Sequence, residues 1–471
     1  LIGGTYSTLS STGSMSENGI ISYAGRFNYN FDSRYFLQLS ARYDGLSSLP
    51  AANKWGFFPG GSIGWTISRE SFMQDVEWLS DLKLRASYAE VGNANIGNYP
   101  YLGLYSGVRY ADYTGILFSQ MGNDQLKWET SKKLNFGVDL AVLEGKYSLT
   151  YDYFVDDVDG LILDKPTPPS FGVPLNRVAT NIGRLRNWGH EFGVQANFIR
   201  TRDLSWTVDF NLSLVQNEIV ELVDDQPITY VYTIVDVGES IRSVYGYDYV
   251  GVNAANGNPI YRKADGSLIQ GDIDAQAYKV YNPANPGDIS QAAILEGKDR
   301  IVFGPSLPTY YGAVNSMLRF KDFDFSAMFR FSGGNYIMNR TRAEIVANSF
   351  TNSGKELLGR WQSPQEPGDG WTPRLYYGRT NFINQQNETS GRFVEKGDFL
   401  KLQNLILGYT LPSQLVGRIG VDRLRIFVSA TELFMITDYT GIDPEMERGA
   451  GYDYNGTPRQ RTFTFGLNLS L

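Results

Sequence analysis

The chain has 471 residues, with 42 Lys and Arg against 50 Asp and Glu, and a formal net charge of −8. It contains no Cys and one His, which excludes disulfide frameworks, thiolate sites and His-rich metal centres. The pI near 5.0 argues against a nucleic-acid partner, which would require a basic surface. With 31 Tyr, 27 Phe and 50 Gly at a mean hydropathy of −0.28, the composition favours strands and turns over helices.

Signals for a helical membrane protein are missing from the sequence. No run of 18 apolar residues occurs, so no transmembrane helix is predicted. The opening stretch LIGGTYSTLSS lacks the basic region of a signal peptide. A membrane-spanning barrel would give neither signal, because its strands are segments of about ten residues with alternating apolarity.

Alternation of this kind recurs along the chain, in about thirteen segments by the period-2 rule. Neighbouring side chains of a strand point to opposite faces, so each segment carries its apolar groups on one side. The clearest strands are predicted, in chain order, at 19–31, 35–43, 134–140, 147–155, 188–198, 204–215, 323–331 and 459–471. In the last of these, Phe463, Phe465, Leu467 and Leu469 should face outward, and Thr464 and Asn468 inward.

A soluble β-sandwich would show the same alternation, so the lengths of the connections are needed to choose between the folds. Compact connections are predicted at 32–33, 68–81, 143–146, 201–204, 321 and 411–422. Long connections alternate with them, at 44–54, 91–132, 156–187, 216–308, 332–398 and 435–459. Short periplasmic turns and long extracellular loops are typical of outer-membrane barrels. We therefore predict an all-β fold, an antiparallel transmembrane β-barrel.

The direction of the strands predicts that this barrel is partial. The long connection 435–459 precedes the last strand, so that strand runs from outside to periplasm. Counting back, the strand at 19–31 runs the same way, which gives an odd number of strands. Bacterial single-chain barrels have even numbers, and an open edge cannot stand in lipid. We expect strands to be missing at the N-terminus, and the fragment alone not to form a functional barrel.

Several stretches resemble one family over nearly the whole chain and in the family's order. They are 34–45 (RYFLQLSARYDG), 54–65 (KWGFFPGGSIGW), 82–93 (LKLRASYAEVGN), 128–140 (WETSKKLNFGVDL), 187–193 (NWGHEFG), 304–326, 399–412 (FLKLQNLILGYTLP) and 457–471. They resemble the SusC/RagA-type TonB-dependent transporters of Bacteroidetes. The sequence departs from the family's pattern at Leu46, Gly60, Ala89 and the terminal Leu471, where Ser, Ser, Gly and an aromatic residue are common.

This resemblance implies a 22-stranded barrel with an N-terminal plug, a carboxypeptidase-like extension and a TonB box. None of these N-terminal parts is expected within the chain. Residues 1–471 would be the C-terminal part of the barrel, strands 10 to 22, with the first strand near 19–31 and the last near 459–471.

The resemblance also implies a function in nutrient uptake. The parent protein would be an outer-membrane active importer of oligosaccharides or peptides, energised by TonB and working with a SusD-like surface lipoprotein. No reaction, cofactor or metal is expected, so the chain is predicted not to be an enzyme. One alternative is a passive porin-type channel, which would need neither plug nor lipoprotein. Another is a soluble β-rich glycan-binding or glycan-cleaving protein, whose apolar strand faces would pack together.

Aromatic residues in the long connections are the candidate ligand contacts, because aromatic faces with polar tips suit sugars and peptides. The candidates are Tyr99, Tyr101, Tyr105, Trp361, Trp371 and Tyr376, with Tyr110, Tyr113 and Tyr377 nearby. Packing between loops, or contact with a partner lid, would explain the same residues. Trp55, Trp65, Trp78, Trp188 and Trp206 are instead predicted near strand ends, where an interfacial aromatic girdle would place them.

Other polar motifs carry weaker signals for chemistry. His190 is predicted at the start of a strand near the lipid headgroups, without the partner that a catalytic His needs. Asp156, Asp157 and Asp159 are predicted in a solvated loop, since their spacing fits no EF-hand calcium site. The glycine-rich stretch 60–62 lies within a strand, where it would permit a tight bend or close packing against a plug.

Overall fold

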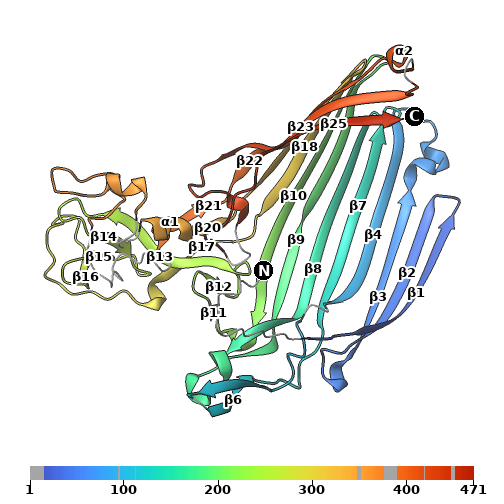
Figure 1. Cartoon of the computed structure of the whole chain (residues 1–471). Coiled ribbons are helices and arrows are strands. Elements are labelled where there is room, and N and C mark those ends of the chain that lie inside the picture. The colour runs from blue at the N-terminus through green and yellow to red at the C-terminus, as the bar shows by residue number, and fades with distance from the viewer. Residues whose placement is uncertain are drawn as a thin grey trace.

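The computed structural model describes residues 15–93, 96–111, 113–346, 352–375, 390–417, 420–446 and 451–470. One antiparallel sheet of thirteen strands dominates these ranges, and Figure 1 shows it as a tall, curved and tilted wall. In spatial order its strands are β1 (Ile20–Phe31), β2 (Tyr35–Leu46), β3 (Trp55–Thr66), β4 (Leu79–Asn93), β7 (Glu129–Val142), β8 (Tyr147–Pro166), β9 (Arg177–Arg200), β10 (Leu204–Leu222), β18 (Tyr310–Phe320), β19 (Phe323–Gly333), β22 (Phe399–Thr410), β23 (Arg423–Thr437) and β25 (Thr462–Ser470).

Spatial order in the sheet follows chain order, so each strand pairs with the next one of the wall. All of these pairings are antiparallel, which confirms the predicted all-β antiparallel fold. In the described part of the chain, β1 is bonded to β2 alone and β25 to β23 alone. The wall therefore has two free edges within these residues.

Connections of the two kinds lie at opposite ends of the wall (Figure 1). The compact end has tight turns at 32–34, 143–146, 201–203 and 321–322, and the short helix α2 (Ser413–Val416). Positive φ angles at Asp32, Leu143 and Lys321 allow the chain to reverse within these few residues. None of the helices in the described ranges is long and apolar enough to cross a membrane.

The other end carries smaller sheets, built from the long connections. These contain β5 (Leu104–Tyr110), β6 (Tyr113–Gln120), β11 (Ile228–Thr229), β12 (Thr233–Val235), β13 (Ser243–Val252), β14 (Pro259–Arg262), β15 (Leu268–Asp272), β16 (Ala277–Val280), β17 (Arg300–Gly304), β20 (Tyr336–Asn339), α1 (Arg340–Ile345), β21 (Val394–Lys396) and β24 (Tyr452–Asp453). Single 3-10 turns are η1 (Ala51–Asn53), η2 (Ile67–Arg69), η3 (Ser71–Met73), η4 (Pro169–Phe171), η5 (Pro174–Asn176), η6 (Val223–Asp225), η7 (Gly297–Asp299), η8 (Lys355–Gly359), η10 (Gly391–Phe393) and η12 (Pro444–Met446).

Apolar side chains cover the outer face of the wall without a second sheet against them. On β25, Phe463, Phe465 and Leu467 are 60%, 79% and 68% exposed. A sandwich would bury these residues between two sheets. Their exposure contradicts the soluble-sandwich alternative.

Three strands extend much further than the sequence predicted. The connection expected at 156–187 shrinks to residues 167–176, because β8 and β9 have 20 and 24 residues. β10, with 19 residues, likewise continues to Leu222. The prediction that Asp156, Asp157 and Asp159 lie in a loop was wrong: all three are strand residues of β8.

The outer face changes character partway along these strands. One row of register partners is apolar: Tyr88, Leu134, Val155 and Trp188. The row two residues further along the same face is charged: Glu90, Lys132, Asp157 and Arg186. This is the change expected where a barrel wall leaves the hydrocarbon of a bilayer. The paired strands β8 and β9 then continue for about 30 Å beyond it, at about 3.3 Å per residue.

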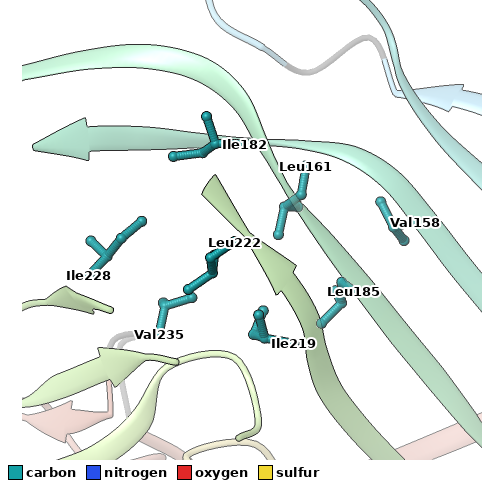
Figure 2. Close-up of a cluster of buried hydrophobic side chains, with 8 residues drawn as sticks. All are labelled: Val158, Leu161, Ile182, Leu185, Ile219, Leu222, Ile228 and Val235. Atoms are coloured by element: carbon teal, nitrogen blue, oxygen red, sulfur yellow. The ribbon is translucent and has the colours of Figure 1, made fainter. Parts of the chain in front are cut away.

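Beyond this boundary the apolar side chains lie on the inner face instead. Ile219 of β10 and Leu185 of β9 are buried there and pack against Ile228 and Val235 of the following segment (Figure 2). Outside, Arg186 and Asp157 form an ion pair at 2.7 Å. The extension of β8–β10 is thus built like a water-soluble domain, whose apolar face needs a covering layer because water, not lipid, surrounds it.

Candidate functional site

The inner face of the wall is the candidate functional surface, because it is polar where the outer face is apolar. Inward-facing charges on neighbouring strands pair in register. Arg85 of β4 donates to Asp139 of β7 at 2.8 Å and to Asp152 of β8 at 3.0 Å. Gly137 lies beside this cluster, and a Cβ there would stand 2.5 Å from the Arg85 guanidinium carbon. Glycine therefore provides the space that the guanidinium occupies.

A second cluster of charges joins the inner wall to the connection after β23. Lys401 of β22 has a side chain only 1% exposed, and its Nζ lies 3.2 Å from Glu432 of β23 and closer still to Glu445. Arg330 of β19 pairs with Glu445 at 2.7 Å, and Arg459 lies 3.4 Å from the same carboxylate. Three cations thus surround two carboxylates. We call these five residues the Lys401 cluster.

A β-bulge sets the direction of the Glu432 side chain in the Lys401 cluster. Glu432 has a φ of +55°, and the pairing of β22 with β23 shifts register between Leu402 and Asn404. The extra residue re-aims the local side chains, as bulges do. Gln403 uses the same geometry to donate to Glu432 at 2.6 Å.

The glycine-rich stretch 60–62 forms part of a hollow in the inner wall of about 440 Å³. Gly60 and Ala89, two departures from the family's pattern, are cross-strand partners. A Cβ on Gly60 would stand 2.9 Å from Ser40 Oγ and 3.4 Å from Ala89 Cβ. The small residues at both positions therefore leave space for the hollow. Ser62, Lys83 and other polar groups line it.

Three predicted ligand contacts lie together near the β5–β6 hairpin. The rings of Tyr99 and Tyr101 are 6.3 Å apart, and Tyr101 packs against a buried cluster around Trp128. Tyr105 of β5 is 68% exposed, with its ring 5.3 Å from Phe118. Tyr101 therefore has a packing role, whereas the Tyr105 ring remains accessible.

Two other predicted contacts lie in a different place, beside the β13–β16 sheet that projects from the wall (Figure 1). Trp361 donates from Nε1 to the carbonyl of Ala254 at 2.9 Å. Trp371 packs edge-on against Tyr249 at 4.9 Å, and its carbonyl accepts from the Tyr249 hydroxyl at 2.7 Å. Burial raises the pKa of the Tyr249 phenol. Tyr376 lies outside the described residues.

Charge pairing also fixes the segment that carries Trp371. Burial opposes ionisation of Asp369, but hydrogen bonds from Thr372 and from the Trp371 amide outweigh it and lower the pKa of the carboxyl. In the same way, Arg342 and Arg392 overcome the effect of burial on Glu356 and hold its pKa below the usual value. Each carboxylate is held by several donors, Asp369 by hydrogen bonds and Glu356 by two ion pairs, so these contacts fix the position of the segment.

The predicted position of the lone His, at the start of a strand, was wrong. His190 lies mid-strand in β9, not at a strand start. Its Nδ1 is 2.9 Å from the Tyr151 hydroxyl, and its ring is 5.2 Å from Tyr153 on the outer face. In the described ranges, no group of three His, Cys, Asp or Glu side chains could hold a metal ion.

The Trp residues predicted near strand ends partly follow that pattern. Trp55 and Trp65 lie at the two ends of β3, Trp206 near the start of β10, and Trp78 just before β4. The prediction was wrong for Trp188, which stands in the middle of β9. Trp188 instead belongs to the last apolar row of the outer face, where interfacial Trp is typical of membrane proteins.

Comparison with known proteins then decides the family. The family described as "TonB dependent receptor-like, beta-barrel" matches residues 2–431. The chain belongs to this family. TonB-dependent receptor P3 of Formosa agariphila is 32% identical over 98% of this chain and 47% of its own length. TonB-dependent receptor SusC of Bacteroides thetaiotaomicron is 30% identical over 97% of this chain and 44% of its own.

Solved structures agree on the fold. The structure of the RagAB peptide transporter superposes with a TM-score of 0.81 over 96% of this chain and 48% of that one, at 24% identity. These relatives and the family match confirm the resemblance to SusC/RagA-type receptors. The family comprises outer-membrane receptors and transporters rather than enzymes. The chain spans about half the length of the curated relatives it matches.

Sequence reasoning missed the charge clusters of the inner wall. Arg85, Asp139 and Asp152 each stand on the polar face of a strand. In sequence, however, Asp139 follows Arg85 by 54 residues and Asp152 follows it by 67. Register between strands brings them together, and a single sequence does not give that register. Opposite charges on the inward parity of successive strands would have been the available signal.

Proposed function

We propose that the chain is the C-terminal part of the barrel of an outer-membrane active importer of oligosaccharides or peptides. TonB energises the importer, and a SusD-like surface lipoprotein works with it as a lid. The observation that carries this proposal is the division of the wall into an apolar outer face and a charged inner face. Such a wall separates lipid from a polar lumen through which a hydrophilic solute can pass.

The free edges of the wall support a longer parent protein. The β1 and β25 edges expose unpaired backbone groups within the described residues, and such edges cannot face hydrocarbon. Strands outside this chain would pair with them and close the barrel, for which the family pattern implies 22 strands. A plug from the same parent protein would fill the lumen and receive the force from TonB.

Substrate contacts are proposed on the side of the long connections. Among the six candidate contacts, Tyr105 has the most exposed of the described side chains, since Tyr99 and Tyr101 are half-buried and Trp361 donates to Ala254; its neighbour Tyr113 is exposed as well. An exposed aromatic ring among the long connections suits the apolar face of a sugar or a peptide side chain. Trp371 lines a separate cleft.

The test is growth of a strain with an in-frame deletion of the full-length gene. On single oligosaccharides or peptide mixtures as sole nutrient, the strain should fail on at least one substrate class that the parent uses. The intact gene should restore growth, and a gene without its TonB box should not. Restoration by the gene without the box would favour the passive porin-type channel and overturn active import.

A further inference from the structure

A cleft of about 770 Å³ opens on the outer face, where the strands β19, β22 and β23 meet the long connections. Its floor is apolar and comes from Phe331, Leu400 and Ile436. Leu400 is the register partner of both other residues, so the three form one row. Ile436 is 63% exposed and Leu400 39%. The floor is therefore open on the side that lipid would cover.

The outer face changes from apolar to charged within this cleft. Asp398 stands just before β22, two residues before Leu400, and Asp438 stands just after β23, two residues after Ile436. Both acids line the cleft. The same change occurs between Val155 and Asp157 of β8 and between their partners Trp188 and Arg186 of β9, so the cleft spans the proposed membrane boundary. Trp371 also lines it, and an indole suits this depth.

Opposite charges meet in the polar half of the cleft. Its lining includes three basic and three acidic side chains: Arg342, Arg392, Lys396, Glu395, Asp398 and Asp438. The arginines are largely neutralised, because Arg342 pairs with Glu395 at 2.9 Å and Arg392 with Glu356 at 2.9 Å. Lys396 and Asp438 are both exposed. A ligand therefore meets charges of both signs.

Arg392 and Asp398 are already engaged within the chain. The Arg392 side chain is only 1% exposed and pairs with Glu356, so a head group in the cleft does not reach it. Asp398 accepts from the Gly334 amide at 2.6 Å. The exposed Lys396 and Asp438 are therefore the charges that a head group can reach.

We propose that this cleft binds a lipid of the outer leaflet with a zwitterionic head group that combines a phosphate with a primary ammonium. One acyl chain covers Phe331, Leu400 and Ile436. The phosphate accepts a hydrogen bond from Lys396, and the ammonium donates to Asp438. A purely anionic head group is disfavoured, because it would face Asp398 and Asp438. The site rests on the proposed function only in that the outer face must contact the membrane.

The test uses the full-length receptor, folded in detergent, delipidated and titrated with defined lipids in native mass spectrometry. Phosphatidylethanolamine should bind at one saturable site, more tightly than phosphatidylglycerol. Lys396→Met and Asp438→Asn should each weaken it about tenfold, the effect of one charge-assisted hydrogen bond. Lys132→Met is the matched control: Lys132 is similarly exposed on the outer face but lies outside the cleft.

The outcomes separate this site from the proposed function. Equal or tighter binding of phosphatidylglycerol would overturn the proposal, and so would equal effects of Lys396→Met and Lys132→Met. Normal heat-modifiable folding of Lys396→Met and Lys132→Met would show that the barrel is intact. Unchanged lipid binding by Lys396→Met would then count against the lipid site alone. Failure of the unmodified receptor to fold into lipid vesicles would instead contradict the membrane function itself.

Discussion

Replacing Glu445 by Gln should weaken the fold more than replacing Lys401 by Met, although both changes remove one charge from the Lys401 cluster. The cluster holds three cations and two carboxylates. Lys401→Met leaves two charges of each sign, whereas Glu445→Gln leaves three cations with one carboxylate, Glu432. Removing one partner of a buried ion pair costs about 3–5 kcal/mol, while an apolar replacement that leaves the remaining charges balanced is often near neutral.

The magnitude follows from what each substitution leaves behind. After Glu445→Gln, Lys401 keeps Glu432 at 3.2 Å, but Arg330 loses its 2.7 Å partner. We therefore expect a loss near the lower limit, about 3 kcal/mol, and a loss within about 1 kcal/mol for Lys401→Met. Glu221→Gln is the control, because the Glu221 side chain is 68% exposed and its ion pair with Arg184 is weak, at a distance of 4.0 Å.

Two assays on the full-length receptor in lipid vesicles check this prediction. Denaturant unfolding measures the stability difference, and tryptic cleavage after Arg459 reports whether the connection after β23 has left the inner wall. Glu445→Gln should lower the unfolding midpoint and speed cleavage. A larger loss for Lys401→Met, or equal losses for the two variants, would refute the assignment of this cluster as a clamp balanced by charge.

Three further sets of substitutions address the outer face, the lone His and the ion pairs of the long connections. Leu212→Arg should reduce folding into vesicles by about 2–4 kcal/mol, because Leu212 faces outward, whereas Asn211→Arg should cost much less; equal costs would contradict the assigned faces. His190→Ala should leave import unchanged in an uptake assay, since its contacts are to Tyr rings and it has no assigned chemistry; loss of import at normal surface expression would show a role. The lowered pKa of Glu356 means that its ionised form stabilises the fold above its unfolded pKa of about 4.3, and that this contribution disappears as pH falls through the lower folded value. The hydrogen-exchange protection factors of residues 352–375, which are corrected for the slower intrinsic exchange at acid pH, should therefore fall at acid pH in the unmodified receptor, and Glu356→Gln should already lower them at pH 7; an acid response that the substitution leaves unchanged would assign it to other groups.

Strand alternation was enough to predict the wall, because lipid outside and water inside impose a period of two on every membrane strand. The segments that contain Phe463 and Leu212 are clear for this reason: both residues have polar neighbours on both sides in sequence. The turns were also predictable, since positions such as Leu143 and Lys321 lie between two periodic segments and leave few residues for the reversal.

The extension of β8–β10 was not predictable from the same rule. Beyond Trp188 the apolar parity moves to the inner face, so the alternation that marks the strand changes phase at Asp157 and Arg186. A charged row at the point of change resembles a loop in sequence, and Asp156, Asp157 and Asp159 were assigned to one. Their pairing partners on β7 and β9 become visible only in the register of the strands.

The candidate site was predicted less completely than the fold. Tyr105 and Trp371 could be selected by residue type. The sequence did not predict that Tyr105 lies on a hairpin and Trp371 in a cleft on the outer face of the wall. The Lys401 cluster depends on a bulge at Glu432 and on a connection that returns to the wall. Both features are tertiary, and local sequence carries no period for them.

The central claim is that the two faces of the wall meet different solvents, and β10 offers the most direct measurement. The chain has no Cys, so single Cys variants at 208–214 can carry a spin label without background from this chain. In the full-length receptor in vesicles, labels at Val208, Phe210 and Leu212 should be accessible to oxygen from the lipid. Labels at Asp209 and Asn211 should instead respond to a water-soluble nickel reagent. Accessibility without this period of two, or even-numbered labels shielded from both reagents, would contradict a membrane-spanning wall.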